Sequence, residues 1–111
     1  MAWKKSSPEE VRRFDELVAV PGAERGVMFG CPVYALNGER YAVLHEGRIA
    51  LRLSEEDGAE LIGKGGWPWE PMKGRRSKGR VVVPDEIAGN ARSLRAWVRK
   101  AVRHATSRKE R

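Results

Sequence analysis

The sequence is poor in the residues that build disulfide frameworks and metal sites. Among its 111 residues there is one cysteine, Cys31, and there are two histidines, His45 and His104. A single cysteine cannot form an internal disulfide, which excludes the small secreted proteins that disulfides hold together. No cysteines or histidines stand at the short spacings that zinc sites use, so we expect no metal ion.

Long apolar runs are also missing. The runs reach only a few residues, as in Val81-Val82-Val83, whereas a transmembrane helix needs about 20 apolar residues. The first ten residues, MAWKKSSPEE, contain no apolar segment of the kind found in signal peptides. We therefore expect a cytoplasmic protein that does not contact a membrane.

The chain shows no motif for catalysis or for cofactor binding. The run Gly63-Lys64-Gly65-Gly66 lacks the upstream glycine and the Lys-Ser/Thr ending of a phosphate-binding loop. Cys31 paired with His45 would have no recognisable oxyanion-stabilising group, so we expect a buried, inert thiol and a partly buried histidine. The sequence predicts a protein that is not an enzyme and has no cofactor.

Positive charge is concentrated in the last third of the chain. The net charge is +7, but residues 1–72 carry nine basic and twelve acidic residues, and residues 73–111 carry thirteen basic and three acidic ones. Five cations fall within the eight residues Lys73–Arg80. This asymmetry favours a basic face for nucleic acid or an acidic partner. It is equally typical of a solvated face and a soluble tail.

The first half of the sequence predicts one helix followed by a meander of strands. Ser7 and Glu10 form a capping box around Pro8, and apolar residues at helical spacing follow as far as the stop at Pro21-Gly22. The period then changes to two, which predicts strands over 33–36, 40–45 and 48–53 and a further edge strand over 25–29. Asn37-Gly38 and Glu46-Gly47 join the strands as tight turns. We expect one face of this sheet to be wet.

The second half predicts a short helix, a hairpin and a long helix. Ser54 caps the short helix, which Leu61 and Ile62 anchor and the glycines after residue 62 end. An extended stretch over 67–72 and a strand over 80–83 flank the basic cluster, which is the tip of a loose hairpin. After a turn at 84–86, Gly89 or Asn90 caps a helix over 91–106, and residues 107–111 are frayed.

The expected architecture is a single α+β domain spanning residues 1–111, ordered over about 7–106. An antiparallel sheet, made of the meander plus the hairpin, packs with an N-terminal helix, a short middle helix and a long C-terminal helix. The last helix has an apolar stripe that faces the core and an arginine stripe opposite it. The members of the arginine stripe are Arg92, Arg95, Arg99 and Arg103.

Two tryptophans beside the basic cluster are the main functional lead. Trp67 and Trp69 stand two apart in an extended segment, so they share one side of it. They could stack nucleobases while neighbouring cations neutralise phosphates, or they could simply cover the core. The residues that would contact nucleic acid, besides Trp67 and Trp69, are Lys73, Arg75, Arg76, Lys78, Arg80, Arg99 and Arg103.

Several short motifs, taken in order, resemble the N-terminal domain of TfoX/Sxy proteins. The first is Arg25-Gly-Val-Met28-Phe29-Gly30, followed by the hairpin Tyr34-x-x-Asn37-Gly38. Later matches include Glu70-Pro71-Met72-x-Gly74-Arg75 and Leu94-x-x-Trp97. The similarity runs over about residues 9–106 and is greatest to stand-alone bacterial members, which are related to MmcQ/YjbR-like domains.

The resemblance implies an α+β fold and a link to regulation. The two-domain members of the family regulate natural competence together with the cyclic-AMP receptor protein, and the resemblance brings no catalytic residue and no cofactor. It favours a regulatory or adaptor domain that binds a protein of the transcription apparatus, with Arg25, Met28, Phe29 and Gly30 at a turn entering the sheet. Direct, largely non-specific DNA binding is the alternative. Whichever function holds, a tight, packed turn explains the motif best, with Gly30 supplying backbone freedom and Met28 and Phe29 in the core. We expect a monomer or a homodimer.

Overall fold

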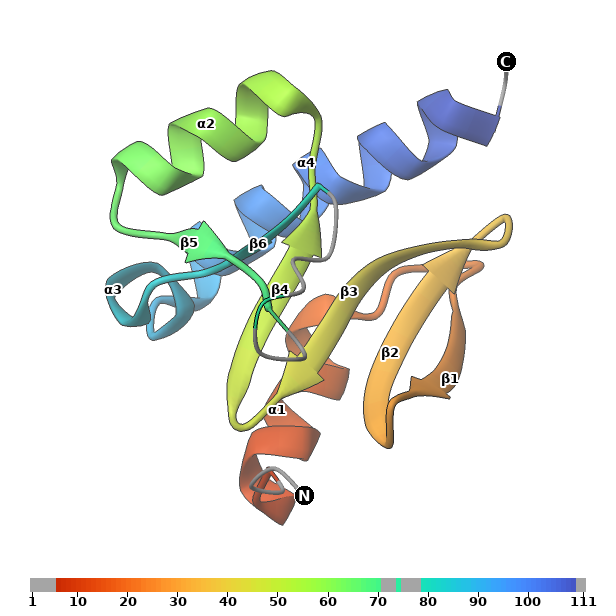
Figure 1. Cartoon of the computed structure of the whole chain (residues 1–111). Helices are drawn as coiled ribbons and strands as arrows, with labels where there is room; N and C mark the ends of the chain where they lie inside the picture. The colour runs from red at the N-terminus through yellow and green to blue at the C-terminus, as the bar shows by residue number, and fades with distance from the viewer. Residues whose placement is uncertain (1–5, 71–73, 75–78, 110–111) are drawn as a thin grey trace.

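The structure, a computed structural model, describes residues 6–70, 74 and 79–109. A six-stranded antiparallel sheet with the order β1-β2-β3-β4-β6-β5 forms its centre (Figure 1). The first four strands form the meander, and the last two form the hairpin. Their bounds are β1 Glu24–Met28, β2 Cys31–Leu36, β3 Glu39–His45, β4 Arg48–Arg52, β5 Trp67–Pro68 and β6 Arg80–Val82. With four helices packed on the sheet, the predicted α+β class is confirmed.

Two-residue turns with positive φ at both positions join the strands of the meander. Asn37-Gly38 has φ of 55° and 85°, and Glu46-Gly47 has φ of 53° and 80°. This is the turn geometry that matches the right-handed twist of a hairpin, and both turns were predicted. A third turn of the same kind, Phe29-Gly30 with φ of 55° and 76°, joins β1 to β2 and confirms the edge strand.

Helix α1, Pro8–Val18, begins as its capping box predicts. The Ser7 hydroxyl accepts a bond from the Glu10 backbone N–H (3.1 Å), and the Glu10 carboxylate accepts one from the Ser7 N–H (2.7 Å). Phe14, Leu17 and Val18 are buried along one side. The helix ends at Val18, three residues before the predicted stop at Pro21.

The other three helices differ from the prediction in detail. Ser54 caps α2, Glu55–Gly63, but only Leu61 anchors it, because Ile62 is 44% exposed. The expected turn is a short helix, α3, Asp85–Ala88. Asn90 is the cap of α4, Ala91–Lys109, because its side-chain oxygen accepts a bond from the Ser93 N–H (3.0 Å). This last helix runs through residues 107–109, which were expected to fray.

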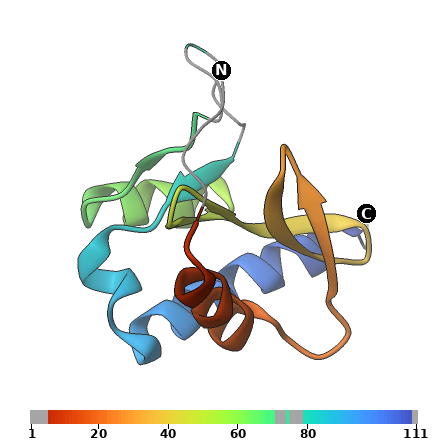
Figure 2. The same ribbon diagram turned by 90° about the horizontal axis from the view of Figure 1, so that it is seen from below.

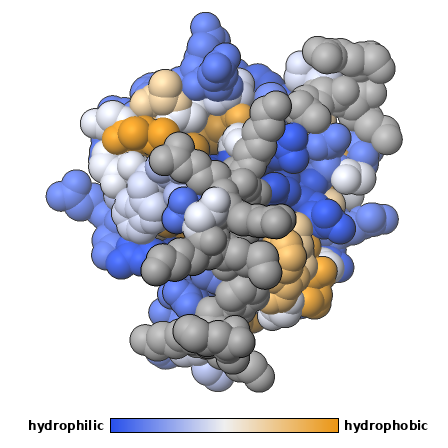
Figure 3. Space-filling view, viewed as in Figure 1, coloured by the Kyte–Doolittle hydropathy of each residue, from blue (hydrophilic) through white to orange (hydrophobic). Residues whose placement is uncertain are grey.

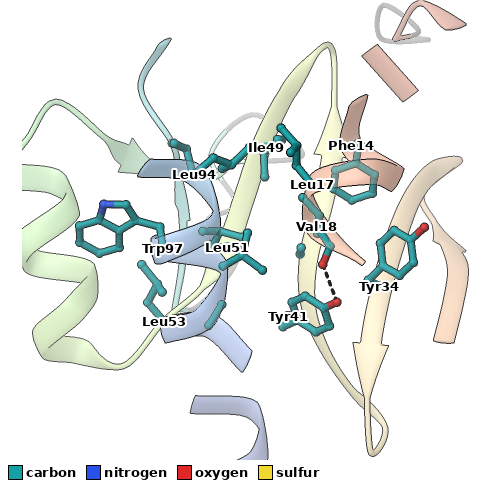
Figure 4. Close-up of a cluster of buried hydrophobic side chains, with 14 of the residues drawn as sticks. Phe14, Leu17, Val18, Tyr34, Tyr41, Ile49, Leu51, Leu53, Leu94 and Trp97 are labelled. Atoms are coloured by element: carbon teal, nitrogen blue, oxygen red, sulfur yellow. Dashed lines mark hydrogen bonds between the residues drawn. The ribbon is translucent and has the colours of Figure 1, made fainter. Parts of the chain in front are cut away.

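Helices α1 and α4 cover one face of the sheet (Figures 1 and 2). The main core lies between them and the strands, and Figure 4 shows Phe14, Leu51, Leu94 and Trp97 within it. A β-bulge between β2 and β3 turns Tyr41 toward the same core as Ala42. The Tyr41 hydroxyl donates to the Val18 carbonyl (2.8 Å), and it thereby ties the end of α1 to the sheet.

The opposite face of the sheet was expected to be wet, and this prediction is only partly right, because Arg48 is exposed there but several apolar side chains are buried. A second cluster of buried residues lies there, and no helix contributes to it. Trp69, which follows β5, folds back over the strands and excludes water from their small apolar side chains. The members of this cluster are Cys31, Val33, Val43, Ala50, Trp69 and Val82, with Met28 packed against it. Within the described ranges, no helix is both long enough and apolar enough to traverse a bilayer.

Candidate binding surface

The sheet face opposite α1 and α4 is the candidate functional surface, which we call the helix-free face. Strand alternation places Arg48 and Arg52 on the same face as Ala50, and Arg80 on the same face as Val82. Trp67 is the cross-strand partner of Val82, so it belongs to this face as well. Figure 3, viewed from this side, shows hydrophilic and apolar side chains reaching the surface together.

Three arginines from neighbouring strands crowd together on this face. Arg52 on β4 stands directly opposite Arg80 on β6, and the Arg80 guanidinium donates to the Arg40 carbonyl on β3 (3.4 Å). Burial, reinforced by the charges of Arg52 and Arg40, lowers the pKa of Arg80 to about 10. Among the described residues, neither Arg40 nor Arg52 forms an ion pair. The face therefore holds concentrated positive charge that an anionic partner would neutralise.

Trp67 and Trp69, the two tryptophans predicted to stack nucleobases or to cover the core, have different surroundings. Trp69 is 3% exposed and is a core residue, and its ring meets the His45 ring edge-on at 5.5 Å between centroids. Trp67 is 41% exposed, and the Arg48 guanidinium lies 5.2 Å from its ring centroid. Arg48 also pairs with Asp85 at 2.8 Å. Of these two tryptophans, Trp67 is the one whose ring is exposed, with Arg48 over part of it.

A cavity of about 330 Å³ opens between the β3–β4 turn and the β5 segment. His45 on its wall is partly buried, and the loss of hydration lowers its pKa while the Glu46 charge opposes that shift. The imidazole is therefore neutral around pH 7. The cavity is lined by His45, Glu46, Arg48, Trp67, Pro68, Trp69, Glu70 and Val82.

The tip of the β1–β2 hairpin displays an aromatic side chain at the edge of the sheet. Phe29 has φ of 55° and is 52% exposed, so its predicted place in the core is wrong. Gly30 supplies the second positive φ of the turn, as predicted, and Met28 packs against the second cluster. Val27 beside them is 67% exposed. The hairpin tip thus presents apolar surface that the fold itself does not bury.

Arg25, the first residue of the same motif, has a structural role. Its guanidinium contacts the Asp15 carboxylate at 2.9 Å, and the Tyr34 hydroxyl donates to the same carboxylate at 2.7 Å. The network joins α1 to β1 and β2. The motif therefore combines an anchoring residue with exposed apolar side chains.

The structure does not gather the predicted nucleic-acid residues into one surface. Arg99 and Arg103 are exposed on α4, which covers the other side of the sheet from Trp67 and Arg80. Lys73, Arg75, Arg76 and Lys78 lie outside the described residues. Arg40, Arg48 and Arg52, which lie on the helix-free face, were not among the predicted residues, although the alternation of Arg48, Ala50 and Arg52 in the sequence indicated that Arg48 and Arg52 share a face.

The described residues offer little for metal or thiol chemistry. No three His, Cys, Asp or Glu side chains in this part of the chain come together as a metal site. Cys31 is buried, as expected, and its thiol lies 3.7 Å from the Phe29 carbonyl oxygen.

Comparison with known families agrees with this fold. The TfoX N-terminal domain family matches residues 15–105, which is most of the chain. The chain belongs to this family. The resemblance seen in the sequence is thereby confirmed, and TfoX N-terminal domains are generally non-catalytic. No curated protein matches this TfoX N-terminal domain.

Proposed function

We propose that this TfoX N-terminal domain is a non-enzymatic regulatory or adaptor domain that binds a protein through its β1–β2 hairpin. The observation that carries the proposal is Phe29, which combines a strained backbone with an exposed aromatic ring. A left-handed backbone costs an ordinary L-residue about 1–2 kcal/mol. At the corresponding positions of the other two hairpins, Asn37 fits at little cost, and Glu46 has a similar φ of 53° but a charged side chain, so Phe29 is the one that combines this backbone with an exposed aromatic ring.

Exposed aromatic residues are frequent anchors of protein interfaces. Strain retained at a residue that the fold does not bury is typical of a functional site. Val27, also exposed, and the outer edge of β1 extend the apolar surface beside Phe29. A protein of the transcription apparatus is the partner that the family suggests.

The variant Phe29→Asn separates folding from binding. It keeps the turn and removes the ring, so the free energy of unfolding should rise by about 1 kcal/mol. Affinity for purified RNA polymerase or the cyclic-AMP receptor protein should fall at least about tenfold, measured by biolayer interferometry. Ile62→Asn, which removes an exposed apolar side chain from α2, is the matched control. Equal affinity of Phe29→Asn and the unmodified domain would contradict the proposal.

Nucleic-acid binding through the helix-free face is a second candidate. It is favoured by the grouping of Arg40, Arg52 and Arg80 on one face, which concentrates positive charge there even with Glu39 nearby. Trp67 and Arg48 lie on the same face and supply a ring for stacking. Arg99 and Arg103 belong to the other side of the molecule and take no part in this candidate surface.

A salt titration with two charge-matched variants tests the second candidate. Arg40→Gln/Arg52→Gln and Arg99→Gln/Arg103→Gln each remove two charges, on opposite sides of the sheet. If Arg40 and Arg52 contact phosphates of duplex DNA, only the first variant should flatten the slope of log K against log salt by about 1.8. Equal weakening by both variants would mean that the attraction depends only on net charge. Absence of binding at about 50–100 mM salt would rule the candidate out.

A further inference from the structure

We propose that the cavity beside Trp69 binds a neutral, planar heterocycle that carries both a hydrogen-bond acceptor and an amino group, namely an unpaired nucleobase. The site does not use the Phe29 hairpin, so it goes beyond the proposed protein-binding function. If the second candidate function holds, the cavity would give it a preference for single strands.

The cavity has the size and the mixed lining of a small-molecule site. Its volume of about 330 Å³ lies within the range of ligand pockets, which begins at about 300 Å³. Its wall contains two indole rings, an imidazole, two carboxylates and a guanidinium, which come from the β3–β4 turn and from the β5 segment. Half of the lining residues have titratable side chains, so the wall is more polar than that of a typical ligand pocket and suits a ligand with several hydrogen-bonding groups.

Trp69 supplies a polar group that lacks a partner. Its Nε1 is buried and has no hydrogen-bond partner among the described residues, and the side chain lines the cavity. A buried N–H without an acceptor is unfavourable and is rare in folded proteins. An acceptor atom on a ligand would satisfy it.

Charged ligands fit the lining poorly. The carboxylates of Glu46 and Glu70 would attract an ammonium or a guanidinium, but such a group has only donors and would leave the Trp69 N–H without an acceptor. An anion could accept from Trp69, but it would meet those two carboxylates and only one guanidinium, Arg48, which already pairs with Asp85. A neutral ligand avoids both conflicts.

A flat ring with an amino group could contact both the Trp67 ring and the carboxylates of Glu46 and Glu70 in the cavity wall. Trp67 exposes part of its ring for stacking, and base–aromatic stacking is largely independent of sequence. Carboxylates such as Glu46 and Glu70 accept hydrogen bonds from the exocyclic amino groups of bases. Cytosine, adenine and guanine meet these conditions, whereas uracil has no amino group.

The test uses uncharged nucleosides, so that phosphate contacts play no part. We expect cytidine, adenosine or guanosine to give saturable shifts of the indole N–H signals in NMR spectra, with dissociation constants of about 0.1–5 mM. Uridine should bind several times more weakly. Trp69→Phe, which keeps an aromatic ring and removes the N–H, should weaken binding about fivefold or more. Trp97→Phe, on the other side of the sheet, should leave the affinity unchanged.

The outcomes separate this site from the proposed functions. Phe29→Asn and Arg40→Gln/Arg52→Gln should not change nucleoside affinity, even where they abolish protein or polyanion binding. No saturable shift with any nucleoside at about 10 mM would overturn the inference. So would equal affinity of Trp69→Phe and the unmodified domain, provided that the variant unfolds at the same urea concentration. Tighter binding of N-acetyl-arginine amide than of cytidine would assign the cavity to a cationic side chain instead.

Discussion

Asp15 joins three elements through a single carboxylate. It accepts hydrogen bonds from Arg25 on β1 and from Tyr34 on β2, whose ring also packs against Phe14 at 5.4 Å between centroids. Burial alone would raise the pKa of Asp15, but the bonds from Arg25 and Tyr34, together with the Arg25 charge, outweigh it and lower the pKa. The ionised carboxylate is therefore the form that the fold stabilises.

The lowered pKa of Asp15 predicts a loss of stability in acid. Since the folded pKa lies below the unfolded value of 3.8, the contribution is complete above that value and is lost as the pH falls through the folded pKa. Asp15→Asn should therefore lower the free energy of unfolding by a constant amount near neutral pH, and by less below about pH 4. Urea unfolding between pH 2.5 and about pH 7 measures it.

The control for this prediction removes a carboxylate outside the network. Glu16→Gln alters the neighbouring exposed carboxylate on α1 and leaves the bonds of Arg25 and Tyr34 in place. A deficit of the Asp15→Asn variant that stays the same at low pH would contradict the assignment, because the contribution would then not depend on ionisation.

At the scale of elements, the end of α2 lies directly against the sheet. Gly66 donates its N–H to the Leu61 carbonyl (3.0 Å), and a Cβ added at Gly66 would lie 2.7 Å from the Val82 carbonyl oxygen. The run of glycines after α2 thus does more than end the helix. Gly66 is the residue that allows the backbone of this segment to approach β6.

Two glycine substitutions in this run should have opposite effects. Gly66→Ala forces backbone atoms apart and should lower the free energy of unfolding by about 1–3 kcal/mol. Gly63→Ala adds a methyl group in the last turn of α2, where nothing lies within 4 Å, so stability should be equal or up to about 1 kcal/mol higher. Chemical unfolding of both variants measures the difference. Equal stability of the two would show that α2 can shift away from β6.

At the scale of the whole molecule, the sheet separates two basic surfaces of different kinds. The arginines of α4 are spread along a solvated helix, whereas Arg52 and Arg80 face each other across two strands. Like charges directly opposite each other in a sheet are destabilising. The repulsion on the helix-free face acts between partly buried arginines, whereas that between Arg95, Arg99 and Arg103 on α4 acts between exposed side chains, where solvent screens it.

Reversing one charge on each side should reveal this difference. Arg52→Glu replaces repulsion of Arg80 by attraction and should raise the free energy of unfolding by about 0.5–1 kcal/mol at low salt. The gain should shrink as salt screens the charges. Arg99→Glu makes the same change in net charge on α4 and relieves only exposed, solvent-screened repulsion from Arg95 and Arg103, so it should give a smaller gain. Thermal unfolding at about 20 mM and about 500 mM salt compares them; equal gains would mean that net charge alone matters.

Much of the binding surface could not be read from local patterns. Trp67 and Trp69 have similar neighbours in the sequence, yet one is exposed and the other covers the sheet. Their difference depends on how the β5 segment folds back over β3 and β4, and no short-range signal encodes that path. Phe29 was misplaced for a related reason, since an apolar residue beside a glycine is usually core, and only the hairpin geometry shows that the ring points outward.

The sequence by itself determined the elements whose signals are local. These are the capping box of α1, the Asn37-Gly38 turn, the change of period after α1 and the apolar stripe of α4. Each depends on residues a few positions apart, so the groups that define it are already close together in the chain. Only the tertiary structure decided that Arg52 lies opposite Arg80 and that the Tyr41 side chain points into the core at a bulge. It also decided that the Trp69 side chain is buried from solvent. These features arise because strands distant in the sequence pair in one register, which packing of the whole molecule selects.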